Sequence, residues 1–195
     1  MQEPKIMNGV NVTDLFNTID AIEENSEIAK FNFRGSNVWL DGGKNRTTIS
    51  DFHGACEDQP HASAFIFKAD EPPVLLGEDT GANPVEYALT ALAACVTTAM
   101  VYHAAARGIH LEEVESRIEG DLDLRGFLGM DKSIRNGYEG VNMKIRVKAD
   151  VPEEQLEEVM NLGPAYSPVF DIFTNSVPVS VSLDRSESSA RKRAA

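Results

Sequence analysis

The stretch GANPVEYALTALAACVTTAMVYHAAARG, residues 81–108, places the strongest constraint on how this chain can fold. It consists mostly of Ala, Leu, Val and Thr, so a helix formed here is apolar nearly all round and buried on most sides. Asn83 is a favourable N-cap, Pro84 suits the first helical position, and Glu86 can accept from the Asn83 amide in a capping box. Gly108 is placed to end the helix. The stretch therefore predicts a central helix around which the other elements pack.

The segments on either side predict a mixture of helices and strands. Apolar residues recur at helical spacing within residues 11–30, where Thr13 is the expected N-cap. Apolar and polar residues alternate in several other segments, and the glycines of DGGKN supply a turn between the first two strands. In chain order we expect a helix (11–30), two strands joined by that turn (31–54), a strand (61–70), the central helix, two strands (110–126 and 141–150), two helices (151–166 and 167–175) and a last strand (177–183). This order is typical of an α+β fold with helices laid on antiparallel sheet.

Three parts of the chain follow from these patterns. Residues 1–30 form an N-terminal helical extension, residues 31–184 form the main domain, and residues 185–195 form a polar tail that we expect to be disordered. A formal net charge of −13 argues against nucleic acid and against anionic membranes as partners. No apolar run reaches the roughly 20 residues that a membrane span needs, and the first residues lack a signal-peptide core. We therefore expect a soluble, cytoplasmic protein.

Two cysteines, Cys56 and Cys95, are too few for a disulfide framework. Neither belongs to a CxxC motif, and the four histidines show no zinc-ligand spacing. We therefore expect no metal and no cofactor. Cys95 lies near the middle of the central helix, where a buried cysteine is commonly an inert small apolar residue. The alternative is that the helix presents a reactive thiol.

Several segments together resemble one known family. GANPVEYALTALAACV, AAARGIHLEEVESRIEGDLDLRG and YSPVFDIFTNSVPVSV are similar to the signature of the OsmC/Ohr family, the osmotically inducible and organic hydroperoxide resistance proteins. The resemblance covers roughly residues 30–184. It implies an intertwined homodimer in which two central helices pack together inside wrapping antiparallel sheets. It also implies a thiol peroxidase reaction, in which a cysteine attacks a peroxide and a second cysteine resolves the resulting sulfenic acid as a disulfide.

The first of the family's two cysteines matches this sequence and the second does not. Cys95 in LAACV corresponds to the reactive cysteine, whereas Ser167, followed by Pro168, stands where the resolving cysteine is expected. A hydroxyl cannot form a disulfide. Cys56 is the other thiol, and it could replace the missing one only if its Cα came within about 7 Å of that of Cys95.

The resemblance also implies a glutamate and an arginine that hold and polarise the thiolate. Glu86 lies nine positions before Cys95 rather than ten, which at 100° per residue puts it on roughly the opposite face of the helix. Arg46, in the turn between the first two strands, is the closest match to the arginine. Lys44 is a rival and Arg34 ranks third.

These residues support two readings. The first is a hydroperoxide reductase in which Cys95 is the catalytic thiolate, Arg46 its activating cation and Glu86 a helper, with an external thiol reducing the sulfenic acid. The second is a homodimer without catalytic activity that binds a small hydrophobic ligand, because residues on the same helix face as Cys95 are small or apolar. A hydrolase that uses Ser167 is a weaker third, since no general base accompanies it.

Overall fold

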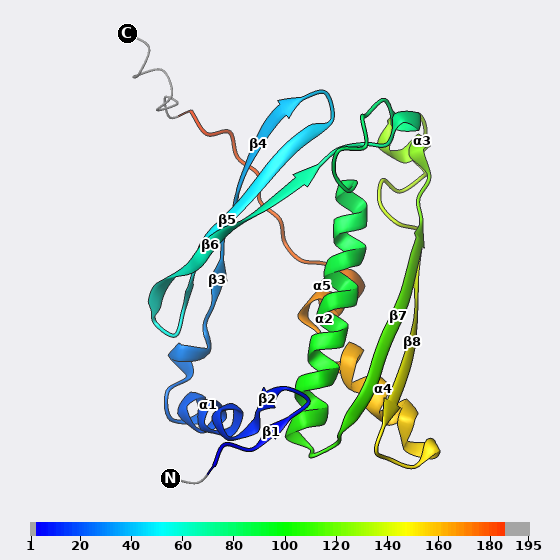
Figure 1. The fold of residues 1–195 in the computed structure, drawn as a ribbon. Coiled ribbons are helices and arrows are strands. Elements are labelled where there is room, and N and C mark those ends of the chain that lie inside the picture. Colours follow the sequence, from blue (N-terminus) through cyan, green and yellow to red (C-terminus); the bar gives the residue numbers. More distant parts are fainter. Residues whose placement is uncertain (1–2, 186–195) are drawn as a thin grey trace.

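The fold is described from a computed structural model of the chain, covering residues 3–185 (Figure 1). The helix α2 runs through the middle of the molecule. A hairpin of long strands lies along one side of it, and a separate four-stranded sheet stands off on the other side. In chain order the elements are β1 (Ile6–Met7), β2 (Val10–Asn11), α1 (Val12–Glu24), η1 (Ser26–Ala29), β3 (Asn32–Phe33), β4 (Ser36–Asp41), β5 (Lys44–Gly54), β6 (Glu57–Ala69), η2 (Pro73–Leu75), α2 (Pro84–Ala106), β7 (Leu111–Asp121), α3 (Leu124–Phe127), β8 (Gly140–Ala149), η3 (Glu153–Gln155), α4 (Leu156–Tyr166) and α5 (Pro168–Thr174).

The central helix begins and ends where its local sequence predicts. The Asn83 side chain accepts from the Val85 amide at 2.9 Å, and the Glu86 carboxylate accepts from the Asn83 amide at 2.8 Å. This is the expected capping box, which satisfies amides that have no partner within the helix. After Ala106 the chain reverses through Gly108, whose φ of +72° suits glycine.

Strands β3 and β4 pair antiparallel with one edge of β5, and β6 pairs with the other. We call these four strands the N-terminal sheet. The expected turn between β4 and β5 is present, with φ of +51° at Gly42. The turn between β5 and β6 has positive φ at both Ala55 and Cys56, the backbone of a two-residue hairpin turn. These turns make the N-terminal sheet a long, twisted arm (Figure 1).

The N-terminal sheet joins α2 at the first turns of that helix. The Tyr87 hydroxyl donates to the Lys68 carbonyl at 2.6 Å, and its ring meets that of Phe67 edge-on with centroids 6.0 Å apart.

The loop that connects β6 to α2 is organised by Asp70, which is 1% exposed. Its carboxylate accepts from the amides of Glu71, Glu78 and Thr80 and from the Thr80 hydroxyl. These four hydrogen bonds lower the Asp70 pKa to about 2.

The compact part of the protein lies at the other end of α2. The residues Met100, Ala104 and Leu162 form a buried core, covered by half-buried apolar side chains of β7 and β8. Helix α4 crosses α2 closely at Gly163, where an added Cβ would lie 2.7 Å from Val96 Cγ1 and 2.8 Å from the Val96 carbonyl oxygen. Glycine is therefore what allows this crossing distance.

The N-terminal extension docks at the same end. Asn8 donates from its side-chain amide to the Ile109 carbonyl and accepts from the Leu111 amide, both at 2.9 Å. Its side chain thus imitates the backbone of a neighbouring strand at the start of β7. Helix α1 follows, but its N-cap is Asn11 and not the expected Thr13. Thr13 instead accepts from the Lys5 amide, because the chain folds back just before the helix.

Two other expectations were wrong. Residues 177–183 form no strand in the described chain, although apolar and polar residues alternate there; Val179 is 82% and Val181 92% exposed. A strand requires a partner edge, and within residues 3–185 none lies beside this segment. The strand expected over 110–126 ends at Asp121, because Asp123 caps the short helix α3 through the Arg125 amide.

Helix α2 is the one helix in residues 3–185 that is long and apolar enough to cross a membrane by length and composition, with a mean hydropathy of 1.5. It contains no unbroken apolar run of the length that a span needs, because Glu86, several threonines and His103 interrupt it. The core helix of a soluble protein meets the same criterion, so this property is weak evidence for a span. Only 28% of the apolar window is buried within the single chain.

Candidate functional site

Cys95 lies at the border between the buried and the exposed faces of α2. Its thiol is half-buried. Among its neighbours on the same face, Leu92 and Ala99 are buried, whereas Ala91, Thr98 and Tyr102 are exposed. No hydrogen bond or ion pair in the described chain involves the Cys95 side chain. The thiol is therefore accessible along one side of the helix and has no charged partner from its own chain.

Glu86 is held on another face of α2, as its spacing from Cys95 predicts. Its carboxylate accepts from the Asn83 amide, and the residue lines a shallow groove with Ser116 and Ile118 of β7. Cys95 does not line that groove. Within one chain the structure therefore gives Glu86 a helix-capping contact and does not bring it to the thiol.

Arg46 projects from the N-terminal sheet on the side away from α2. Its neighbours Asn45 and Thr47 share a cavity with Tyr87 of α2, and alternate residues of a strand point to opposite faces. Arg46 is exposed and forms no ion pair with a described residue. The three proposed site residues, Cys95, Glu86 and Arg46, are thus not assembled within a single chain.

The two rival cations are already paired. Lys44 Nζ lies 2.7 Å from Glu78, an ion pair that raises the Lys44 pKa. The Arg34 guanidinium binds Asp51 at 2.6 Å and Asp58 at 2.8 Å. Arg46 is therefore the cation of this group that retains its full hydrogen-bonding capacity.

Ser167, at the position of the second cysteine, has a structural contact. It is 3% exposed, and its Oγ accepts from the Phe170 amide at 3.1 Å as the N-cap of α5. A buried hydroxyl occupied in this way gives no support to the hydrolase alternative. Cys56 is exposed at the β5–β6 turn, which lies well away from α2 in Figure 1.

Sequence reasoning missed an aromatic and basic cluster near the end of α2. The rings of His103 and Tyr166 stack with centroids 3.6 Å apart, and the Arg107 guanidinium lies 5.7 Å from the Tyr166 centroid. Arg107 Nη1 is 3.2 Å from His103 Nδ1. Burial, together with the Arg107 charge, lowers the His103 pKa, which favours the neutral imidazole. The one signal in the sequence was the four-residue spacing of His103 and Arg107 on a helix.

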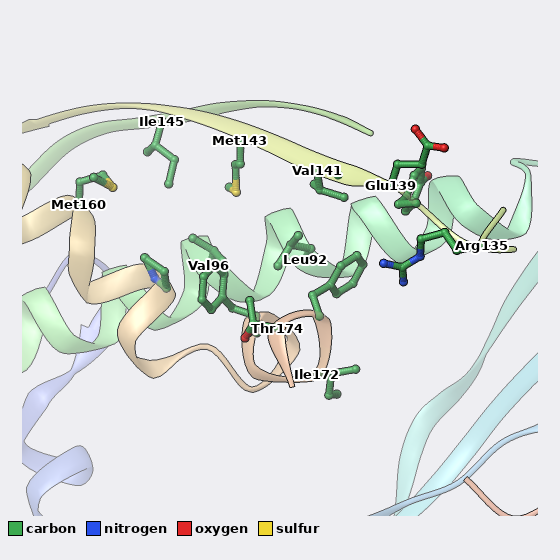
Figure 2. Close-up of a pocket in the computed structure, with 15 residues that line it drawn as sticks. Leu92, Val96, Arg135, Glu139, Val141, Met143, Ile145, Met160, Ile172 and Thr174 are labelled. Atoms are coloured by element: carbon green, nitrogen blue, oxygen red, sulfur yellow. Dashed lines mark hydrogen bonds between the residues drawn. The ribbon is translucent and has the colours of Figure 1, made fainter. Parts of the chain in front are cut away.

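Sequence reasoning also missed a cavity of about 610 Å³ between α2, β8, α4 and α5 (Figure 2). Its wall is mostly apolar, with Leu92, Val96, Met143 and Met160 among the lining residues. Cys95 is not one of them. Because the wall comes from four separate elements, no local motif could have indicated it.

Comparison with known proteins agrees with this architecture. A family model described as OsmC-like protein matches residues 77–182, which is more than half of the chain. An OsmC-like protein from Mycoplasma pneumoniae is 14% identical with a TM-score of 0.56, covering 74% of this chain and 89% of its own. A protein from Psychrobacter arcticus described as an osmotic stress induced and detoxification response protein is 13% identical with a TM-score of 0.52, covering 71% of this chain and 85% of its own. An OsmC-like protein from Vibrio cholerae is 14% identical with a TM-score of 0.50, covering 72% of this chain and 92% of its own.

The comparison with curated protein sequences gives no match. Structural likeness at these identities establishes the fold alone. The match of the family model over residues 77–182, which include the whole of α2 and Cys95, establishes the family. This chain belongs to the OsmC-like family and has its α+β fold, as its sequence signature indicated.

Proposed function

We propose that this protein protects against organic hydroperoxides by reducing them at the Cys95 thiol. The single observation that carries the proposal is the placement of Cys95: it is half-buried, on the central helix of an OsmC-like fold, and open to one side. A thiolate that attacks a peroxide needs access to its substrate and shelter from bulk water, and this position offers both. We place the reaction in the cytoplasm, where reducing conditions keep both cysteines as thiols.

The reaction has two steps. The Cys95 sulfur attacks one oxygen of the O–O bond, which breaks; the protein gains a sulfenic acid and the alkoxide leaves as an alcohol after taking up a proton. Two external thiols then reduce the sulfenic acid to the thiol, forming their own disulfide and releasing water. An external thiol is required because Ser167 cannot form a disulfide and Cys56 lies on a distant hairpin turn.

We propose that the working unit is a homodimer. The chain exposes 14789 Å² of surface, about 1.6 times the roughly 9,100 Å² expected for a compact monomer of 21.3 kDa. Large apolar side chains are exposed on the N-terminal sheet, such as Phe33 (75%) and Trp39 (70%), and the Cys95 face of α2 is open as well. A second copy would bury these surfaces and could bring its own Arg46 to the thiol.

Peroxide consumption by the purified protein tests the reaction. Cumene hydroperoxide and a dithiol are supplied to the wild type, to Cys95→Ser and to the matched control Cys56→Ser. The wild type and Cys56→Ser should consume peroxide at similar rates, and Cys95→Ser should not. Equal activity in all three proteins, or none in the wild type, would refute the proposal.

A second assay tests the cation. Hydrogen bonds to charged groups contribute about 1.5–3 kcal/mol, so Arg46→Gln should slow the reaction by roughly tenfold or more. Arg34→Gln is the control, because Arg34 is occupied by Asp51 and Asp58. An Arg46→Gln protein with the wild-type rate would mean that another group activates Cys95.

The cavity favours a second candidate function, the binding of a small hydrophobic ligand without catalysis. Its volume of about 610 Å³ lies within the range of roughly 300–1,000 Å³ typical of small-molecule sites. This candidate would be preferred if the peroxide assay gave no activity and a ligand were found in the cavity.

A further inference from the structure

The cavity between α2, β8, α4 and α5 is apolar along its length and charged at one end. Figure 2 shows Ile145, Met143 and Val141 in a row along one wall, with Val96 and Leu92 of α2 facing them. Arg135 lies at the end of this row. The cavity is therefore apolar along one wall and ends beside the Arg135 cation.

Arg135 is free to bind an anion. It comes from the loop between α3 and β8, and no carboxylate in residues 3–185 lies within ion-pair distance of its guanidinium. Glu139 is the other charged residue of the lining, and in Figure 2 its carboxylate points away from the Arg135 guanidinium. The Arg135 guanidinium points toward the apolar row.

The neutral polar groups of the lining are already occupied. The Tyr138 hydroxyl donates to the Val85 carbonyl at 2.8 Å, and the Thr174 hydroxyl donates to the Phe170 carbonyl at 2.9 Å. Arg135 is thus the one donor among these groups that has no acceptor in the described chain. A guanidinium binds a carboxylate through two parallel hydrogen bonds, which gives orientation as well as affinity.

We infer that this cavity binds a fatty carboxylate, with Arg135 holding the carboxylate group and the apolar wall holding the hydrocarbon chain. Met143 and Met160 suit such a ligand, because methionine adapts its shape to irregular apolar partners. The inference deepens the ligand-binding candidate above and rests on it. It does not involve Cys95, which lies outside the cavity lining.

Isothermal titration of the full chain tests the inference, with hexanoate, octanoate and decanoate as probes and 1-octanol as the uncharged match. All titrations use the Cys95→Ser protein, so that the result is independent of the peroxide reaction. Each added CH₂ contributes about 0.8 kcal/mol, so the Kd should fall about fourfold per CH₂. Octanoate should bind at least about tenfold more tightly than 1-octanol, given the charge-assisted hydrogen bonds to Arg135.

Arg135→Gln should remove the preference for octanoate over 1-octanol and leave the dependence on chain length. Arg125→Gln is the control, because Arg125 of α3 is bound to the N-cap residue Asp123 and does not line the cavity. Equal binding of octanoate and 1-octanol, no dependence on chain length, or an Arg135→Gln protein that keeps the preference would overturn the inference. Loss of peroxide consumption on its own refutes only the Cys95 reaction, because these titrations do not depend on it.

Discussion

The crossing of α4 over α2 offers a sharp test of how the central helix is held. Gly163 lies at the closest point, where an added Cβ would be 2.7 Å from Val96 Cγ1 and 2.8 Å from the Val96 carbonyl oxygen. We therefore consider Gly163→Ala, the smallest substitution that fills this space. Two opposing effects decide its outcome.

In favour of the substitution, alanine is preferred over glycine in a helix interior by about 1 kcal/mol. Against it, carbon atoms attract best at about 3.5–4.0 Å, so the new contact with Val96 Cγ1 would be about 1 Å too short. Overpacking of this kind typically costs about 1–3 kcal/mol, and a backbone oxygen cannot rotate out of the way as a side chain can. Because one of the two close contacts is with this rigid backbone oxygen, we expect the cost of overpacking to lie in the upper part of that range. After the helix preference of alanine is subtracted, the free energy of unfolding should fall by about 1–2 kcal/mol.

Urea unfolding followed by circular dichroism at one protein concentration measures the effect. The midpoint should fall with an unchanged slope. Gly140→Ala is a control for glycine replacement, because an added Cβ there meets nothing within 4 Å. Val96→Ala combined with Gly163→Ala should be less destabilising than the sum of the two single changes by at least about 0.5 kcal/mol, since one of the clashing atoms is gone. A Gly163→Ala protein as stable as the wild type would refute this account of the crossing.

Three further predictions concern other contacts. Asp70→Asn should lower stability at neutral pH and reduce the loss of stability that the wild type shows as the pH falls from about 4 toward 2. The folded-state pKa of Asp70 is about 2 and its unfolded-state pKa is higher, so this carboxylate contributes part of that loss; acid unfolding curves of both proteins measure the difference. His103→Phe should keep the ring stacking and remove the loss of stability that His103 causes as the pH falls below about 6.5. Burial lowers the folded-state pKa of His103, so the unfolded chain binds the proton more readily and acid favours unfolding. Urea midpoints between neutral and mildly acidic pH measure this, and an unchanged pH profile would contradict it. Asn8→Gly should release α1 from Ile109 and Leu111, and glycine tolerates the positive φ at position 8. Loss of the two hydrogen bonds should lower the stability of this docking by about 1–3 kcal/mol. Hydrogen exchange in α1 should rise, while exchange in α2 stays as in the wild type.

The features that could be predicted from the sequence are those that depend on neighbours along the chain. The capping box of α2 and its end at Gly108 were predicted because each contact joins residues at most three positions apart. The family signature supplied the fold. Residues 177–183 show the limit of such reasoning. Their alternation is that of a strand, but a strand exists only where another edge meets it, and residues 3–185 of one chain provide none.

The candidate site shows a similar limit. The position of Cys95 on α2 and the placement of Glu86 away from it both follow from helix geometry. The location of Arg46 depends on which face of the N-terminal sheet it occupies and on how that sheet is oriented, and neither is encoded near residue 46. The cavity was not predicted, because Arg135 and Met160 are brought together only by the packing of a loop and a helix that are separated in sequence by β8.

The attachment of the N-terminal sheet has a mechanical consequence. The contacts that tie it to α2 lie at one place, where Tyr87 holds Phe67 and the Lys68 carbonyl, while the rest of the sheet extends outward. At its other end the sheet is connected to the docked N-terminal extension by the chain between η1 and β3. A sheet held by side-chain contacts at one end and by a chain connection at the other acts as a lever, so a small rotation about the first turns of α2 becomes a larger displacement at the far hairpin. A displacement of the far hairpin likewise produces a rotation at α2. Force applied to the tip of this arm, by a second copy or by any other partner, is delivered as torque to the helix that carries the thiol.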